Sequence, residues 1–213
     1  MTRVKICGIT GTSQALAAAE AGANYLGLVF APGRRQINPQ KAAEIVRRVH
    51  TLKSPPLMVG VFVNSPVEEV NSLAESCRLD CVQLSGDESW EYCLQIKKPL
   101  VRAIHIAGHS AVRDIIEEVE KGHRILAGAD LICLLDTRVK NAYGGTGQKF
   151  DWQLAREVCA RFPVMIAGGL APENLAQLIA EVHPWGVDVS SGVETGGRKD
   201  LHKIRDFIAI AKG

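Results

Sequence analysis

Short apolar runs recur along the whole chain, and each is followed by a longer segment in which polar and apolar positions mix. A short run without a polar break is typical of a buried strand, and the longer segments carry the caps and breakers of helices. The pattern predicts strands over Val4–Cys7, Tyr25–Phe30, Leu57–Val63, Cys81–Leu84, Leu100–Ile104, Leu131–Leu135, Val164–Ala167 and Gly186–Val189. It predicts helices over residues 13–22 (capped by Ser13), 39–50, 66–77, 89–97, 111–121, 152–161, 172–181 and 201–212.

Strands that each precede a helix predict a parallel sheet, because parallel neighbours need a crossover connection. Eight such units favour closure into a (β/α)8 or TIM barrel, and the chain is at the compact end of the size range of that fold. An open, doubly wound sheet is the alternative. No linker or low-complexity segment interrupts the pattern, so we expect residues 1–213 to form a single barrel domain.

Composition and charge exclude several classes of partner. The formal net charge is +2 and no basic stripe with interleaved aromatic residues occurs, so we expect no nucleic-acid partner. No signal-peptide pattern and no run of membrane-spanning length is present, so we expect no membrane association. The six cysteines form no CxxC pair, which favours reduced thiols in the cytoplasm. His105 and His109 are four residues apart without further ligands, so we expect no metal site.

In barrels of this kind, active sites lie at the C-terminal ends of the strands. Gly168 and Gly169 follow the seventh predicted strand, and Ser190, Ser191 and Gly192 follow the eighth. Backbone N–H groups of glycine-rich turns, together with a helix N-terminus, bind phosphate in these folds. The simpler interpretation is that the glycines only make tight turns, but their pairing on adjacent strands favours a phosphate site.

The first strand carries Lys5 and Cys7 on one side, because side chains alternate along a strand. A buried lysine needs a carboxylate partner, and Asp188 on the neighbouring eighth strand is the natural candidate. A lone buried cysteine is more often a small apolar core residue than a reactive group. Asp136 directly follows the sixth strand, and its simpler interpretation is a loop-capping carboxylate.

The stretch from Leu131 to Trp152 combines a strand, this aspartate and a loop with Gly144, Gly145 and Gly147. So many glycines indicate unusual backbone dihedrals or a close approach to a ligand. No Gly-Lys-Ser/Thr follows, so the loop is not a Walker loop. Asp151 is predicted to cap the helix that follows.

The order of several segments resembles the phosphoribosylanthranilate isomerase family. The resemblance extends from residue 3 to about residue 200. Its segments are Lys5-Ile6-Cys7-Gly8-Ile9-Thr10, Gly60-Val61-Phe62-Val63-Asn64, Leu134-Leu135-Asp136-Thr137, Gly144-Gly145-Thr146-Gly147 with Phe150-Asp151-Trp152, Ala167-Gly168-Gly169-Leu170, and Asp188-Val189-Ser190-Ser191-Gly192-Val193-Glu194.

The resemblance implies an enzyme of tryptophan biosynthesis that uses no metal or organic cofactor. It implies an Amadori rearrangement of N-(5-phosphoribosyl)anthranilate to 1-(2-carboxyphenylamino)-1-deoxyribulose 5-phosphate. By similarity, Asp136 is the general acid that opens the furanose ring, and Cys7 is the general base that removes the C2 proton. Arg35 corresponds to the arginine near the anthranilate carboxylate, and Asp188 is a further substrate contact. The phosphorylated small molecule is the expected partner, of a monomer or a homodimer.

Two positions depart from the family pattern. Ser85 stands where the family usually has histidine, and a serine hydroxyl can form hydrogen bonds to substrate but does not titrate near neutral pH. In the loop after the second strand, Gly33-Arg34-Arg35-Gln36 replaces the more usual Ser-Pro-Arg-Tyr. The carboxylate contact therefore falls on Arg35 or, one residue earlier, on Arg34.

Two other functions remain open from the residues alone. Another phosphosugar enzyme on this scaffold is one, although an epimerase would have metal-binding histidines at the strand ends and an indole-glycerol-phosphate synthase would have lysine and glutamate there. A non-catalytic barrel that binds a phosphorylated metabolite is the other, and it would not need Cys7 together with Asp136. A cysteine base must start as a thiolate. We therefore expect Lys5, Arg35 and helix N-termini to lower the pKa of Cys7.

Overall fold

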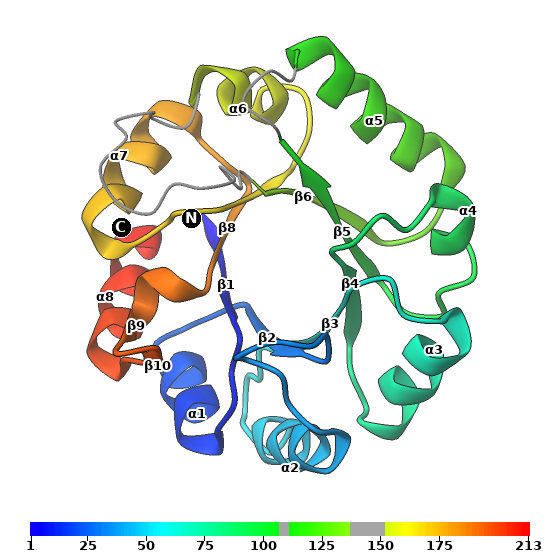
Figure 1. The fold of residues 1–213 in the computed structure, drawn as a ribbon. Helices are drawn as coiled ribbons and strands as arrows, with labels where there is room; N and C mark the ends of the chain where they lie inside the picture. The colour runs from blue at the N-terminus through cyan, green and yellow to red at the C-terminus, as the bar shows by residue number, and fades with distance from the viewer. Residues whose placement is uncertain (107–110, 137–151) are drawn as a thin grey trace.

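Eight parallel strands close into a barrel that is surrounded by helices (Figure 1). The computed structural model describes residues 1–106, 111–136 and 152–213. The first strand pairs with both the second and the eighth, so the sheet has no open edge. This confirms the predicted (β/α)8 barrel and excludes the open sheet.

The predicted strands are all present, with ends that differ by one residue at most. They are β1 (Arg3–Cys7), β2 (Tyr25–Val29), β3 (Leu57–Phe62), β4 (Cys81–Leu84), β5 (Leu100–His105), β6 (Leu131–Asp136), β7 (Met165–Ala167) and β8 (Gly186–Val189). The helices are α1 (Thr12–Glu20), α2 (Pro39–Val49), α3 (Val67–Ser76), α4 (Trp90–Cys93), α5 (Val112–Ile125), α6 (Trp152–Cys159), α7 (Pro172–Val182) and α8 (Leu201–Lys212).

Three helix predictions were wrong in detail, and one of them is α5, which continues to Ile125 rather than ending at Lys121. Ser13 does not cap α1, because Gly11 is already the N-cap, in an extended conformation, and Ser13 lies in the first turn. Helix α4 ends at Cys93 rather than near Lys97, because the backbone N–H of Lys97 donates to the side chain of Asn71 at 3.0 Å and leaves the helical path. The segment after β8 contains a short 3-10 turn η1 (Ser191–Val193), and it adds a hairpin of β9 (Glu194–Thr195) and β10 (Arg198–Lys199) that was not predicted.

The apolar side chains form two layers, because alternate positions of each strand face opposite sides of the sheet. Inside the barrel, residues such as Val59, Val101, Leu134 and Met165 pack together. Between the strands and the helices lies a larger cluster that includes Ile6, Leu28 and Phe207. The barrel interior is therefore filled with side chains, and any ligand site lies at one of its ends.

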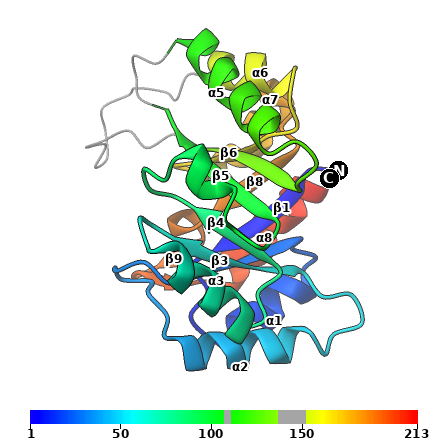
Figure 2. The same cartoon turned by 90° about the vertical axis from the view of Figure 1, so that its right-hand side faces the viewer.

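The chain returns to its starting point, and its two termini lie side by side (Figures 1 and 2). Because all eight strands run in one direction, their C-terminal residues gather at one end of the barrel. Cys7, Leu84, Asp136 and Val189 are the last residues of four of these strands. This end contains the residues that the sequence analysis selected.

Candidate active site

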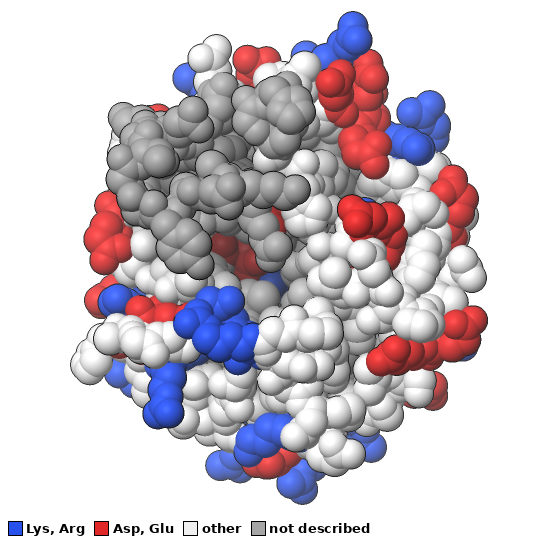
Figure 3. All heavy atoms as spheres, in the orientation of Figure 1, with Lys and Arg blue, Asp and Glu red and all other residues white. Residues whose placement is uncertain are grey.

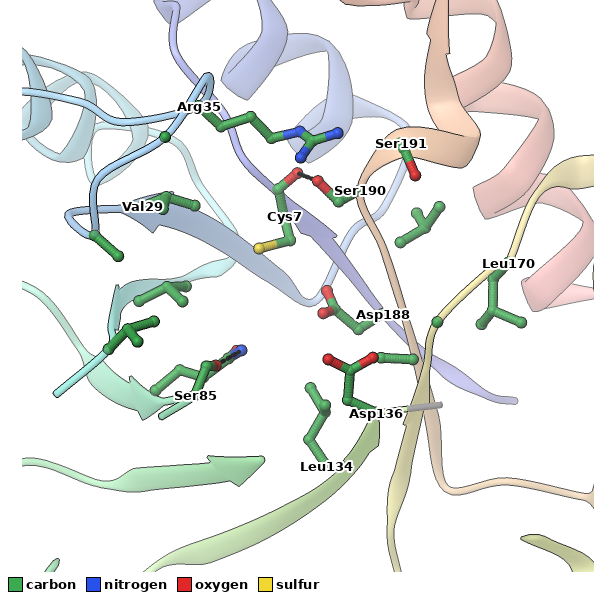
Figure 4. A pocket seen from close by; sticks show the side chains of 18 of the residues that line it. Cys7, Val29, Arg35, Ser85, Leu134, Asp136, Leu170, Asp188, Ser190 and Ser191 are labelled. Carbon is green, nitrogen blue, oxygen red and sulfur yellow. Dashed lines mark hydrogen bonds between the residues drawn. The ribbon is translucent and has the colours of Figure 1, made fainter. Parts of the chain in front are cut away.

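A cavity of about 590 Å³ opens at the C-terminal end of the barrel. The predicted residues that line it are Cys7, Arg35, Ser85, Asp136, Gly168, Gly169, Asp188, Ser190 and Ser191. Figure 4 shows the side chains of Cys7, Asp136 and Asp188 converging on one space, with Ser85 on one side and the serines of the β8 loop on the other. The fold therefore brings together residues that are up to 184 positions apart, since Cys7 and Ser191 line the same cavity.

Lys5 and Asp188 form the buried ion pair that the sequence predicts. Their Cα atoms are register partners between β1 and β8, and Lys5 Nζ lies 3.0 Å from Asp188 Oδ1. The Lys5 side chain is 0% exposed. Burial alone would lower the pKa of Lys5, but charge and hydrogen-bond interactions with Asp188 and Cys7 raise it above its ordinary value. The side-chain ammonium group of Lys5 thus lies beneath the cavity, paired with Asp188.

Gly27 on β2 provides the space that Lys5 and Cys7 occupy. A Cβ atom at Gly27 would lie 2.9 Å from Cys7 Sγ and 3.1 Å from Lys5 Nζ. Any larger residue there would displace one of the two groups. The cysteine and the ammonium group are therefore held next to each other by a close approach of β1 and β2.

The expected lowering of the pKa of Cys7 is wrong for the ligand-free site. Burial raises the pKa of the Cys7 thiol, and the negative charge of Asp188 also raises it, while Lys5 and Lys199 lower it in part. The result is a pKa above the ordinary thiol value. Desolvation of the thiolate outweighs the nearby cations, because Cys7 is 8% exposed.

Asp136 is the last residue of β6, and its side chain is 15% exposed. Its carboxylate lines the cavity together with Leu134, the preceding inward-facing residue of the same strand. Asp136 Oδ2 lies 3.5 Å from Nδ1 of His105, at the end of β5. The glycine loop over residues 144–147 and the predicted cap at Asp151 lie outside the described residues, as does His109.

The loops after β7 and β8 approach each other closely at the cavity. Gly168 and Gly169 have φ values of 94° and 65°, in the region that glycine adopts readily. Gly192 does not line the cavity with the other predicted residues, and a Cβ there would overlap the carbonyl oxygen of Leu170. It therefore lets the two loops approach each other. The Ser190 hydroxyl donates to the carbonyl oxygen of Cys7 at 3.1 Å and joins this loop to β1.

The Glu194 carboxylate forms ion pairs with three basic side chains at the rim of the cavity. It accepts from Arg35 Nε at 2.6 Å, from Arg34 Nη2 at 2.7 Å and from Lys199 Nζ at 3.0 Å. Burial acts to raise the pKa of Glu194, but the hydrogen bonds and charges of Arg35 and Lys199 outweigh it and lower that pKa. Arg34 is 60% exposed and Arg35 28%, so Arg35 is the more enclosed of the two candidate carboxylate ligands. Basic side chains gather beside the hollow at this end of the molecule (Figure 3).

Ser85 follows β4 and is held by its neighbours. Its hydroxyl accepts from Gln83 Nε2 at 2.9 Å, and its backbone carbonyl lies 3.0 Å from His105 Nε2. Both Gln83 and Ser85 line the cavity. Gln83 Oε1 is buried and, within the described residues, has no hydrogen-bond partner, so it can accept from a bound ligand.

Sequence reasoning did not identify His105, Glu194 or Lys199 as site residues. Glu194 and Lys199 belong to the β9–β10 hairpin. Its strands have two residues each, which is too short for an alternation of polar and apolar positions to be recognised. His105 is the last residue of β5, and this position at the C-terminal end of the barrel could have identified it as a candidate site residue. In the described parts of the chain, no group of three or more His, Cys, Asp or Glu residues could hold a metal ion. Nor does any described helix have the length and apolar character needed to cross a membrane.

The chain is similar to one protein family over nearly its whole length. The family model of N-(5'phosphoribosyl)anthranilate (PRA) isomerase matches residues 4–210. The N-(5'-phosphoribosyl)anthranilate isomerase of Dehalococcoides mccartyi is 48% identical over 212 residues, which cover 100% of this chain and 96% of that relative.

Solved structures give the same relationship. A crystal structure of monomers derived from the dimeric phosphoribosylanthranilate isomerase of Thermotoga maritima has a TM-score of 0.81 and 38% identity, with 100% of both chains covered. Another isomerase structure, in complex with reduced 1-(o-carboxyphenylamino)-1-deoxyribulose 5-phosphate, has a TM-score of 0.82 and 38% identity, again with 100% of both chains covered.

Proposed function

We infer the roles of the site residues from the premise that the chain belongs to the N-(5'-phosphoribosyl)anthranilate isomerase family. It is an intramolecular oxidoreductase of tryptophan biosynthesis, which converts N-(5-phosphoribosyl)anthranilate to 1-(2-carboxyphenylamino)-1-deoxyribulose 5-phosphate. We propose that Asp136 is its general acid and Cys7 its general base. The observation that carries this proposal is that both side chains line one cavity, at the ends of β6 and β1.

Each of the two proposed catalytic residues transfers a particular proton. Asp136 donates its proton to the furanose ring oxygen, the C1–O bond breaks, and the nitrogen lone pair forms a C=N bond. The Cys7 thiolate then removes the proton from C2, and the electron pair of that bond moves to form an enolamine. When the enolamine becomes the ketone, its C2 hydroxyl loses one proton and C1 gains one. These two protons restore the balance, so no external oxidant or reductant takes part.

The remaining cavity residues are proposed to bind the two ends of the substrate. The phosphate would be held by Gly168, Gly169, Ser190 and Ser191, which line the cavity in the turns after β7 and β8. The loops are held together at Gly192. Arg35, whose side chain lies close to Ser190, would contact the anthranilate carboxylate.

Two further groups that line the cavity are proposed to contact the sugar hydroxyls. They are Ser85, whose hydroxyl faces the cavity beside Gln83, and Asp188, whose carboxylate lies over Lys5. The substrate would therefore lie across the barrel mouth with its reacting carbons between Cys7 and Asp136.

Domain, assembly and location follow as further proposals. We propose that residues 1–213 act as one catalytic domain that needs no organic cofactor and acts in the cytoplasm as a monomer or a homodimer. The strands of the barrel begin at Arg3 and the last helix ends at Lys212, which supports a single domain. The six cysteines are free thiols, which supports a reducing compartment.

Alkylation tests the role of Cys7 directly. Iodoacetamide should inactivate the enzyme, and the substrate should protect it, because Cys7 lines the cavity. Only the thiolate reacts, and burial raises the pKa of Cys7. The inactivation rate should therefore keep rising as the pH increases from about 7 to above the ordinary cysteine pKa of about 8.5. Inactivation that persists in Cys7→Ala, or that substrate does not slow, would assign it to another cysteine.

A further inference from the structure

His105 lies beside the proposed general acid and on the same face of the sheet. Its Cα atom is the register partner of Asp136 between β5 and β6, and paired residues of parallel strands point to the same side. Two residues earlier, their neighbours Ala103 and Leu134 both belong to the cluster inside the barrel. The imidazole Nδ1 lies 3.5 Å from Asp136 Oδ2, and the backbone N–H of Ile106 donates to the Asp136 carbonyl at 3.0 Å.

The other ring nitrogen fixes the protonation pattern of the imidazole. His105 Nε2 lies 3.0 Å from the backbone carbonyl oxygen of Ser85. A carbonyl oxygen can only accept a hydrogen bond, so Nε2 must carry a hydrogen atom. In the neutral imidazole, the lone pair is then on Nδ1, the nitrogen that faces Asp136. A backbone carbonyl thus orients the ring with its basic nitrogen toward the carboxyl group.

A second carboxylate, that of Asp188, interacts electrostatically with Asp136. Burial raises the pKa of Asp188, and the negative charge of Asp136 adds to this effect, so the two carboxylates repel each other. Asp188 is already held as the partner of Lys5 at 3.0 Å. A proton between Asp136 and His105 leaves that pair of side chains with no net charge and relieves the repulsion.

We propose that His105 is a positioning residue for Asp136 and shares the proton that Asp136 delivers to the substrate. This inference rests on the proposed role of Asp136 as the general acid. The proton lies between Asp136 Oδ2 and His105 Nδ1 before the reaction and moves through Asp136 to the furanose oxygen. It returns when the C2 hydroxyl of the enolamine loses its proton. The contact shortens to hydrogen-bond length in the substrate complex, as catalytic contacts of ligand-free enzymes commonly do.

Three substitutions separate proton sharing from simple support of the loop. His105→Gln can keep a donor to the Ser85 carbonyl but places no basic nitrogen next to Asp136. His105→Asn can keep a polar group next to Asp136 that cannot carry the proton. His105→Ala opens a space for added imidazole. The kcat and KM of each variant are measured by the loss of substrate fluorescence on freshly made phosphoribosylanthranilate.

All three variants should lose about tenfold in kcat, equivalent to about 1.4 kcal/mol of transition-state stabilisation, while KM stays near the wild-type value. Added imidazole should restore part of the kcat of His105→Ala and should not change that of Cys7→Ala. The matched control is His50→Gln, which removes another histidine–aspartate contact, of 3.0 Å to Asp80, away from the cavity. Its kcat should remain that of the wild type.

Wild-type kcat in His105→Gln or His105→Asn would overturn the proposal, and so would failure of imidazole to act on His105→Ala. The Cys7→Ala variant, measured in the same series, distinguishes failure of the His105 proposal from failure of the proposed acid–base mechanism. If Cys7→Ala is inactive while the His105 variants are fully active, only the role of His105 is wrong. If Cys7→Ala is fully active, the proposed acid–base mechanism fails and the proposal for His105 fails with it.

Discussion

At the scale of single residues, the burial of the proposed base Cys7 opposes its ionisation to the thiolate. A free cysteine has a pKa of about 8.5, and burial in this cavity raises the pKa of Cys7 further. Lys5 and Lys199 act in the other direction and lower the cost of forming the thiolate. Lys199 is 2% exposed and donates to the Ser190 carbonyl at 2.8 Å, so its position is fixed. The uncharged thiol of Cys7 therefore lies beside Lys5 and Lys199, the two cations that favour its thiolate.

The two arginines of the β2 loop should differ in their effect on substrate binding. Arg35→Ala should raise KM by at least about tenfold with little change in kcat, because a charge-assisted hydrogen bond contributes about 1.5–3 kcal/mol. Arg34→Ala is the matched control, since Arg34 binds the same Glu194 carboxylate but is 60% exposed. Steady-state kinetics of both variants measure the difference. If Arg34→Ala has the larger effect on KM, the carboxylate contact lies one residue earlier than proposed.

At the scale of elements, the site depends on how closely the loops after β7 and β8 approach each other. Gly192 contacts the carbonyl of Leu170 from the other loop, and Ser190 bonds the end of β1. The 3-10 turn η1 begins at Ser191 and contains Gly192. The geometry of the proposed phosphate site is thus set by backbone contacts among three strand ends rather than by any one side chain.

A methyl group at Gly192 should weaken phosphate binding. In Gly192→Ala the new Cβ would overlap the Leu170 carbonyl oxygen and push the loops apart. Inorganic phosphate, which should compete with substrate in the wild type, should then have a clearly higher inhibition constant. Gly11→Ala is the control, because its Cβ would meet Gln14 only at an ordinary 3.8 Å. Phosphate that inhibits Gly192→Ala as well as the wild type would place the anion elsewhere.

Sequence patterns predicted the parts of the site that belong to regular elements. Cys7 and Asp136 end apolar strands, so the barrel order placed them at one mouth. The same reasoning found the pairing of Lys5 with Asp188, because strand alternation and strand order decide it. Contacts that depend on loop conformation could not be predicted this way, and the contacts of Glu194 with the two arginines of the β2 loop are an example. The sign of the pKa change of Cys7 was also missed, since the charges are visible in the sequence but the degree of burial is not.

At the scale of the whole molecule, the buried ion pair lies where the barrel closes. β1 and β8 are the first and last strands, and Lys5 and Asp188 are register partners across that junction. Both side chains are nearly inaccessible to water, at 0% and 9% exposure. A charge in this position is tolerated only when it is paired, so the two residues are coupled in their effect on stability.

Removal of one partner should therefore destabilise the barrel. Lys5→Met leaves the Asp188 carboxylate buried without its ammonium partner, and the free energy of unfolding should fall by about 3–5 kcal/mol. Urea denaturation followed by circular dichroism measures this change. Lys41→Met is the matched control, because it breaks only the exposed pair with Glu44 on α2 and should change stability little. Equal stabilities of the two variants would mean that the buried pair contributes nothing to closure of the barrel.

The central claim is that Cys7 and Asp136 together carry the proton transfers, and single-residue removal of the base tests it most directly. The measurement is the turnover of phosphoribosylanthranilate by Cys7→Ala, followed by the loss of substrate fluorescence, with inorganic phosphate binding as the check that the fold is intact. We predict that kcat falls by at least about a hundredfold while phosphate still binds, as expected for a general base. Turnover by Cys7→Ala at nearly the wild-type rate would contradict the account.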